Sequence, residues 1–147
     1  MSKLLLLVGV VLLAVSPARA QVAADSIAIR QAALDYIEGW YEADAERMAR
    51  AVHPELAKRL VRTDRQSASS DIRQMGASEL IMQTRRGGGK ETPKERQRKD
   101  VRILDIFEST SSVRVDADSW IDYMHLAKAD GRWQIVNVLW ALRPSPK

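Results

Sequence analysis

The clearest alternation of apolar and polar positions lies near the C-terminus. Residues 120–126 and 132–140 are rich in aromatic and β-branched side chains, and Asp130-Gly131 stands between them. An Asp-Gly pair between two such runs is a strong signal for a β-hairpin. Three of the four tryptophans fall in this hairpin: Trp120, Trp133 and Trp140. Large rings bury the most area, so these tryptophans mark a core wall or a pocket wall.

The N-terminal part of the chain repeats its apolar residues at three- and four-residue spacing instead. One stripe contains Ile29, Ala33, Tyr36, Ile37 and Trp40. This spacing predicts a helix over residues 26–42, which Asp25 or Ser26 can cap. Gly39 weakens that helix by about 1 kcal/mol relative to alanine, and it permits another element to approach closely.

A second, shorter helix is predicted to follow. Asp44 can cap it, and it runs through Val52 to a His53-Pro54 pair. The helix ends there because the residue before a proline disfavours the α region. A helix C-terminus favours a protonated imidazole, so we expect His53 to satisfy terminal carbonyl groups rather than to catalyse a reaction.

The middle of the chain carries weaker patterns. Residues 55–63 predict a brief strand, and the polar residues 64–74 predict a loop. A third helix is predicted from Ser78, as its cap, through Thr84, and the glycines at 87–89 stop it.

The remaining strands complete a meander. Residues 101–107 and 113–117 predict a strand pair around the polar residues 109–111, and the tryptophan-rich hairpin follows. Helices followed by a run of strands indicate an α+β fold, with three N-terminal helices packed on a curved antiparallel sheet.

This order of elements resembles the NTF2-like cone fold of nuclear transport factor 2, ketosteroid isomerase and the SnoaL-like proteins. The nearest resemblance is to the bacterial family called "putative lumazine-binding". It extends over about residues 27–142. Four stretches carry it: residues 36–40 together with Asp44; residues 78–80 together with Thr84 and the glycines after it; residues 122–126; and residues 133–137 together with Trp140. The resemblance implies a pocket between the long first helix and the concave face of the sheet.

Tyr36 and Trp40 lie one helical turn apart, so both could face such a pocket. The alternative is that they are core residues, because apolar stripes are usually core, and both interpretations can hold if the pocket is small. Together with Trp120, Asp122 and Trp140 they form the expected ligand-binding set.

Asp122 is the one acidic residue in that set. Strand alternation places it with Trp120, Met124 and Leu126, the more apolar face, which we assign to the interior; His125 falls on the opposite face. An acid among large apolar groups can serve as a neutral donor or as a base, and ketosteroid isomerase uses both. The alternative is a structural role, in which Asp122 caps a bend or pairs with an arginine.

The N-terminus has the pattern of a secretory signal peptide. Lys3 precedes the apolar run 4–15, and Ala18-Arg19-Ala20 ends in small residues, so we expect cleavage before Gln21 and a single domain over residues 21–147. The apolar run is too short for a stable membrane span. The protein is therefore expected to be secreted or periplasmic. Removal of Lys3 and Arg19 lowers the formal net charge from +4 to +2, so the basic pI is weak support for nucleic-acid binding.

Two further features limit the chemistry. The chain has no cysteine and two histidines, so we expect neither disulfides, nor a metal site, nor a cofactor. Residues 85–99 hold seven basic and two acidic side chains. Gly87-Gly88-Gly89-Lys90 lacks the phosphate-loop pattern. We expect a solvated loop, with a lid for an anionic ligand or a contact with acidic lipid as alternatives.

These patterns support three functions. The leading one is a non-enzymatic, exported module that binds a small apolar or aromatic ligand. We expect it to form a homodimer through the outer face of the sheet. The second is a proton-transfer enzyme or hydrolase of the ketosteroid isomerase type that uses Asp122. The third is an interaction protein whose pocket is filled by its own side chains.

Overall fold

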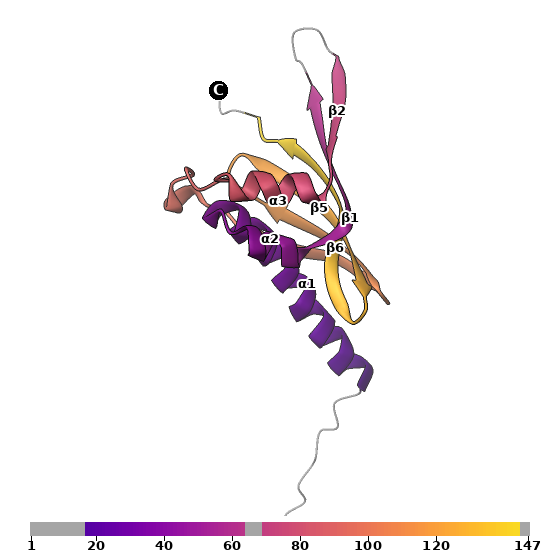
Figure 1. Cartoon of the computed structure of the whole chain (residues 1–147). Coiled ribbons are helices and arrows are strands. Elements are labelled where there is room, and N and C mark those ends of the chain that lie inside the picture. Colours follow the sequence, from indigo (N-terminus) through magenta and orange to yellow (C-terminus); the bar gives the residue numbers. More distant parts are fainter. Residues whose placement is uncertain (1–16, 64–68, 145–147) are drawn as a thin grey trace, which may run out of the picture.

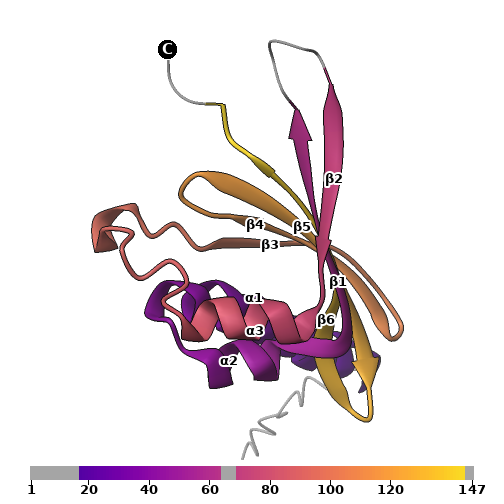
Figure 2. The ribbon, with the colours of Figure 1, turned by 45° about the horizontal axis from the view of Figure 1, so that its top comes forward.

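Three helices cover one face of a curved six-stranded sheet in the computed structural model (Figure 1, Figure 2). The structure describes residues 17–63 and 69–144. Lys3 and the apolar run 4–15 of the predicted signal peptide lie outside the described residues. The elements are α1 (Pro17–Glu42), α2 (Ala45–Ala51), β1 (Val52–Thr63), β2 (Ser70–Met75), α3 (Ala77–Arg85), a short 3-10 helix η1 (Lys94–Arg96), β3 (Asp100–Phe107), β4 (Thr110–Asp116), β5 (Trp120–Ala129) and β6 (Arg132–Leu142).

The α+β class with three helices is confirmed, but the sheet is mixed. Its strand order is β2-β1-β6-β5-β4-β3. All neighbours are antiparallel except β1 and β6, which run parallel and bring the N-terminal strand beside the C-terminal one. The helices do not all precede the strands either, because β1 and β2 lie between α2 and α3.

The predicted loop over 64–74 is wrong for residues 70–74, which belong to β2. This strand lies at the edge of the sheet, and its residues are exposed up to Met75. A strand that buries neither face has no alternation to detect, so its composition resembles that of a loop. Residues 64–68 lie outside the described part of the chain.

The long helix α1 buries the predicted stripe but begins earlier than expected, at Pro17. Asp25 and Ser26 therefore do not cap it: the Ser26 hydroxyl donates to the Val22 carbonyl, and Asp25 accepts from Lys128 and Trp133. Four residues of the stripe are buried, namely Ile29, Ala33, Tyr36 and Ile37, and Trp40 is half-buried. Ala32 and Tyr41 of α1 are also buried.

Helix α2 is capped by Asp44 as predicted, through hydrogen bonds from the Glu46 and Arg47 backbone N–H groups. It ends at Ala51, and Val52 already begins β1, so the predicted end is one residue too far. His53 consequently sits in a strand and not at a helix terminus. Its Nδ1 accepts the Glu55 backbone N–H at 3.1 Å, which replaces the role expected for it.

Gly39 lets α2 pack closely against α1, as a glycine inside this helix predicts. A Cβ atom at Gly39 would stand 3.1 Å from the Met48 nitrogen and 3.2 Å from the Asp44 carbonyl oxygen. Helix α3 begins one residue before Ser78, which is therefore inside the helix; the N-cap is Gly76, without a side-chain hydrogen bond.

Of the two C-terminal hairpins, the sequence predicted the turn between β5 and β6 correctly but not the start of β4. Asp130 (φ 50°) and Gly131 (φ 75°) form the predicted two-residue turn between β5 and β6. Strand β4 begins at Thr110, three residues earlier than expected, and the preceding turn uses Glu108 (φ 48°) and Ser109. The sequence predicts a turn at residues 109–111 because serine and threonine are common in turns, but Thr110 and Ser111 already pair with β3.

Candidate functional site

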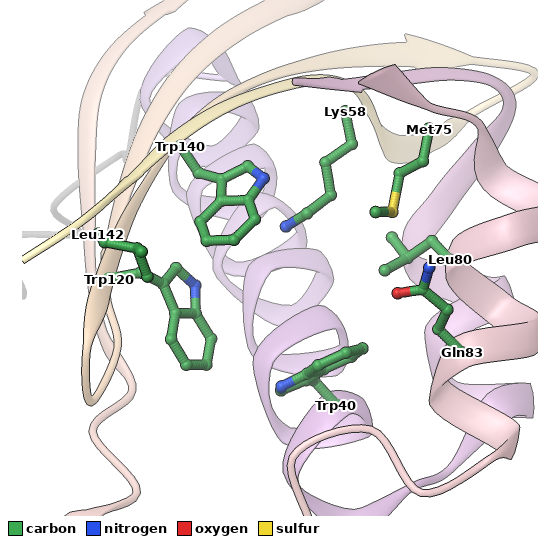
Figure 3. A pocket seen from close by; sticks show the side chains of 8 residues that line it. All are labelled: Trp40, Lys58, Met75, Leu80, Gln83, Trp120, Trp140 and Leu142. Atoms are coloured by element: carbon green, nitrogen blue, oxygen red, sulfur yellow. The ribbon is translucent and has the colours of Figure 1, made fainter. Parts of the chain in front are cut away.

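A pocket of about 320 Å³ lies between α1, α3 and the inner face of β1, β5 and β6 (Figure 3). This is within the range of volumes typical of small-molecule sites. Its lining is apolar with two polar side chains, and consists of Trp40, Lys58, Met75, Leu80, Gln83, Trp120, Trp140 and Leu142.

Three tryptophan rings form the wall of this pocket. Trp40 comes from α1, Trp120 from β5 and Trp140 from β6, and Figure 3 shows their rings around the same space. Each is half-buried. The fourth, Trp133, is 6% exposed and packs elsewhere in the core, where its Nε1 donates to Asp25 at 2.8 Å.

The glycine triplet, Gly87-Gly88-Gly89, packs against Trp40. The Gly89 backbone N–H donates to the Trp40 carbonyl oxygen at 2.8 Å. A Cβ atom added to Gly88 (φ 48°) would stand 2.5 Å from that same carbonyl oxygen. A Cβ atom added to Gly89 would stand 2.6 Å from the Trp40 ring. The triplet does end α3, as predicted, but the absence of side chains at 88 and 89 also allows the loop to close against the pocket wall.

A buried polar cluster lies behind the lining. Asp122 is fully buried. Its Oδ2 accepts from Trp120 Nε1 at 2.7 Å, and its Oδ1 accepts from the Tyr36 hydroxyl at 3.4 Å and from Lys58 Nζ at 3.3 Å. Lys58 Nζ also donates to the Tyr36 hydroxyl. Every member of the cluster therefore has a polar partner, as a buried cluster requires.

The structure thus places Asp122 on the interior face, as the alternation predicts. The suggested arginine partner is wrong: the cation beside Asp122 is Lys58, which the sequence analysis did not single out. Lys58 reaches the site because β1 pairs in parallel with β6, with Lys58 opposite Val138. A lysine in a short ambiguous strand gives no signal for such a long-range pairing.

Burial dominates the electrostatics of this cluster. Desolvation, followed by the negative charge of Asp122, raises the pKa of the Tyr36 hydroxyl well above its ordinary value. Desolvation lowers the pKa of the Lys58 amine, and Asp122 opposes that change without cancelling it. The Lys58 ammonium also lies 4.8 Å from the centroid of the Trp140 ring, a distance at which cation–π attraction operates.

The predicted residues therefore divide into two groups. Trp40, Trp120 and Trp140 line the pocket, whereas Tyr36 (2% exposed) and Asp122 lie behind the lining. Trp140 Nε1 is buried, and no hydrogen-bond acceptor reaches it within residues 17–63 and 69–144. Trp140, whose ring lines the pocket next to the Lys58 amine, thus carries one buried N–H donor without an acceptor from the described residues.

The basic loop borders the mouth of the pocket. A second hollow, which Arg86 and Lys90 help to line, shares Trp40 and Gln83 with the pocket. The end of this basic loop is held by ion pairs from Arg96 to Asp118 and from Lys99 to Glu38. The expectation of a solvated loop therefore does not hold for these two residues.

Within residues 17–63 and 69–144, no group of three or more histidine, cysteine or acidic side chains is placed to hold a metal ion. No helix among these residues is long and apolar enough to cross a membrane.

The fold is similar to several solved structures, all at low sequence identity. A protein of unknown function from Shewanella baltica has a TM-score of 0.61 and 18% identity, over 84% of this chain and 97% of that one. One from Methylobacillus flagellatus has a TM-score of 0.62 and 21% identity, over 82% and 94%. An NTF2-like protein with a cystatin-like fold from Novosphingobium aromaticivorans has a TM-score of 0.63 and 13% identity, over 88% of each chain.

The comparison with curated protein sequences gives no match. The sequence profile of one family, described as "putative lumazine-binding", matches residues 24–141. That match runs from Ala24 in α1 to Ala141, one residue before the end of β6, and so includes every residue of the pocket wall except Leu142. The chain therefore belongs to the "putative lumazine-binding" family, and its fold is NTF2-like.

Proposed function

We propose that this protein binds a small planar aromatic molecule that carries a hydrogen-bond acceptor. The observation that supports this most strongly is the wall of three tryptophans around Lys58 and the unpaired Trp140 N–H. Aromatic rings stack favourably on tryptophan, while an acceptor on the ligand would satisfy the two donors. Pockets of this kind, mostly apolar with a few placed polar groups, are typical of small-molecule sites.

Lumazine, a bicyclic pteridine with two carbonyl groups, has this chemistry and gives the family its description. It is therefore a reasonable first compound to test, although the pocket's features define a class of ligand rather than one molecule. The hollow beside Trp40 is lined by two basic residues, Arg86 and Lys90, and one acidic residue, Glu91, so its net positive charge would suit a ligand that also carries a negative charge.

The rival function, catalysis with Asp122 as a base, has weaker support. A general base must come within hydrogen-bond reach of the proton it removes. Asp122 lies behind Trp120 and Lys58, and both of its oxygens already accept hydrogen bonds. The third function, a pocket filled by its own side chains, is disfavoured by the open volume of about 320 Å³.

Native mass spectrometry of the protein purified from its own host tests the proposal. We expect a co-purified aromatic molecule, released on denaturation, whose binding is weakened by Trp140→Leu. Leu104→Ala is the control, because Leu104 is a 55% exposed apolar residue of β3 that does not line the pocket. If Leu104→Ala weakens binding as much as Trp140→Leu does, the ligand site lies elsewhere.

We further infer that the protein is exported, from Lys3, the apolar run 4–15 and Ala18-Arg19-Ala20. From residue 20 onwards, the first buried side chain of α1 is that of Asp25, which lies after the expected cleavage site. Intact-mass analysis of secreted material is expected to show a chain that begins at Gln21. A chain that retains Met1 in the cytosol would refute export.

A homodimer through the outer face of the sheet completes the proposal. Tyr123 and Leu139 are cross-strand neighbours on that face and are 47% and 44% exposed. Leu139→Lys is expected to shift the protein to a monomer in sedimentation velocity. Met82→Lys, at an exposed apolar residue of α3, is the control. A wild-type protein that is monomeric at all concentrations would contradict the dimer.

A further inference from the structure

The Lys58 amine is the one nucleophile that the described residues place in the pocket wall. Its side chain is 8% exposed, and Figure 3 shows the amine directed into the space between the tryptophan rings. An ammonium group has three N–H donors. Two are used by the Tyr36 hydroxyl and Asp122, so the third is free for a ligand in the pocket.

The surroundings of this amine favour its reactive form. Burial lowers the pKa of Lys58, which increases the share of neutral amine at neutral pH. Lysines that attack carbonyl groups are commonly activated by a desolvating pocket of this sort. Lys94, by contrast, is exposed, and Lys99 and Lys128 are held by ion pairs with Glu38 and Asp25.

We propose that Lys58 condenses with an aromatic aldehyde or ketone in the pocket to form a protonated imine. The inference rests on the proposed function, because the carbonyl compound must first enter between the tryptophans. The roles of Tyr36 and Asp122 follow from their contacts with the amine.

The reaction balances without any further reactant. The Lys58 ammonium gives one proton to Asp122, and the freed electron pair of the nitrogen adds to the carbonyl carbon. The Tyr36 hydroxyl protonates the former carbonyl oxygen and regains a proton from the nitrogen, which gives a carbinolamine. The proton held by Asp122 then passes through Tyr36 to the carbinolamine hydroxyl, which leaves as water. The product is a protonated imine beside the Asp122 carboxylate, so the net charge is unchanged.

Reductive trapping tests this proposal on the wild-type protein. The full chain is incubated at neutral pH with one equivalent of 2-naphthaldehyde, reduced with borohydride, and mapped by peptide mass spectrometry. We expect Lys58 to carry more of the naphthylmethyl label than all other lysines together. We also expect excess 2-naphthol, which fills the pocket but has no carbonyl group, to suppress labelling at Lys58 alone.

Two variants give matched controls. Lys58→Arg keeps the positive charge and is expected to lose the dominant label, whereas Lys94→Arg is expected to retain it. Label spread over the surface lysines, with 2-naphthol still quenching tryptophan fluorescence, would overturn imine formation while leaving ligand binding intact. If 2-naphthol causes no quenching and Lys58 is unlabelled, both the imine and the proposed function fail.

Discussion

Replacing Asp122 with asparagine is expected to destabilise the fold strongly, because it removes the only acidic partner that the described residues give to Lys58. An asparagine has nearly the same shape, but its amide cannot accept from both Trp120 and Lys58 as the two carboxylate oxygens do. Removing one partner of a buried ion pair typically costs about 3–5 kcal/mol.

A limit on this cost comes from the lysine itself. The stranded Lys58 amine can escape the penalty by releasing its proton. From its ordinary pKa of 10.5, that release costs about 5 kcal/mol at pH 7, at about 1.4 kcal/mol per pH unit. The expected loss at pH 7 is therefore about 3–5 kcal/mol in the free energy of unfolding.

The sign of the pH dependence follows from the same argument. When the folded pKa of Lys58 lies below its unfolded value, the unfolded state binds more protons between the two values, so stability rises with pH there. The deficit of Asp122→Asn should therefore shrink as pH rises from 7 towards 10. Above 10 the raised pKa of Tyr36 acts in the opposite direction, because the unfolded tyrosine ionises first.

Urea unfolding at several pH values, followed by circular dichroism, measures this effect. Asp100→Asn is the control, since Asp100 pairs with Arg98 on the surface at 61% exposure and should change stability by less than about 1 kcal/mol. Adding Lys58→Met to Asp122→Asn should recover much of the loss, because no unpaired charge then remains buried. A single-variant loss no larger than that of the control would refute the buried ion pair.

Three more predictions concern the pocket wall and the acid stability. Trp140→Phe keeps the ring and removes the unpaired N–H, so it should weaken binding of an acceptor-bearing ligand by about 0.5–1.5 kcal/mol, measured by calorimetry; an unchanged Kd would exclude this donor. Gly89→Ala should lower the melting temperature and displace the Trp40 ring, because the new Cβ atom would stand 2.6 Å from that ring. In the control, Gly131→Ala, the new Cβ atom meets no atom within 4 Å, and the only strain comes from the φ of 75°. Hydrogen bonds from Lys128 and Trp133 lower the pKa of Asp25 from 3.8 to about 2. The contribution of Asp25 to the free energy of unfolding is therefore present above pH 4 and is lost as pH falls through 2. In Asp25→Asn the loss of stability over this pH interval should be smaller than in the wild type.

The parts of the fold that the sequence predicted are those with a strong local period. The stripe of α1 and the hairpin at Asp130-Gly131 each combine a regular pattern with a specific turn or packing signal. Strand β2 lacked any such pattern, since it is exposed on both faces. The start of β4 was missed because serine and threonine suit both turns and strands.

The site was predicted in part for the same physical reason. Alternation along β5 located Trp120 and Asp122 on the inner face, because a strand fixes side-chain direction with a period of two. Lys58 and the support that Gly88 and Gly89 give to Trp40 depend instead on contacts between residues far apart in the chain. No local sequence pattern predicts the parallel pairing of β1 with β6. Lys58 therefore could not be identified from the sequence as the partner of Asp122.

The four indole N–H groups provide the most direct measurement of ligand binding in this pocket. In ¹⁵N-tryptophan-labelled protein each indole gives its own NMR cross-peak, and the peaks can be assigned by single Trp→Phe variants. On titration with lumazine, the peaks of Trp40, Trp120 and Trp140 should shift together in a saturable manner. The Trp133 peak should stay in place, because its N–H is held by Asp25 outside the pocket. Four unmoved peaks for lumazine and for 2-naphthol, or a Trp133 shift as large as the others, would contradict an aromatic-binding site between the helices and the sheet.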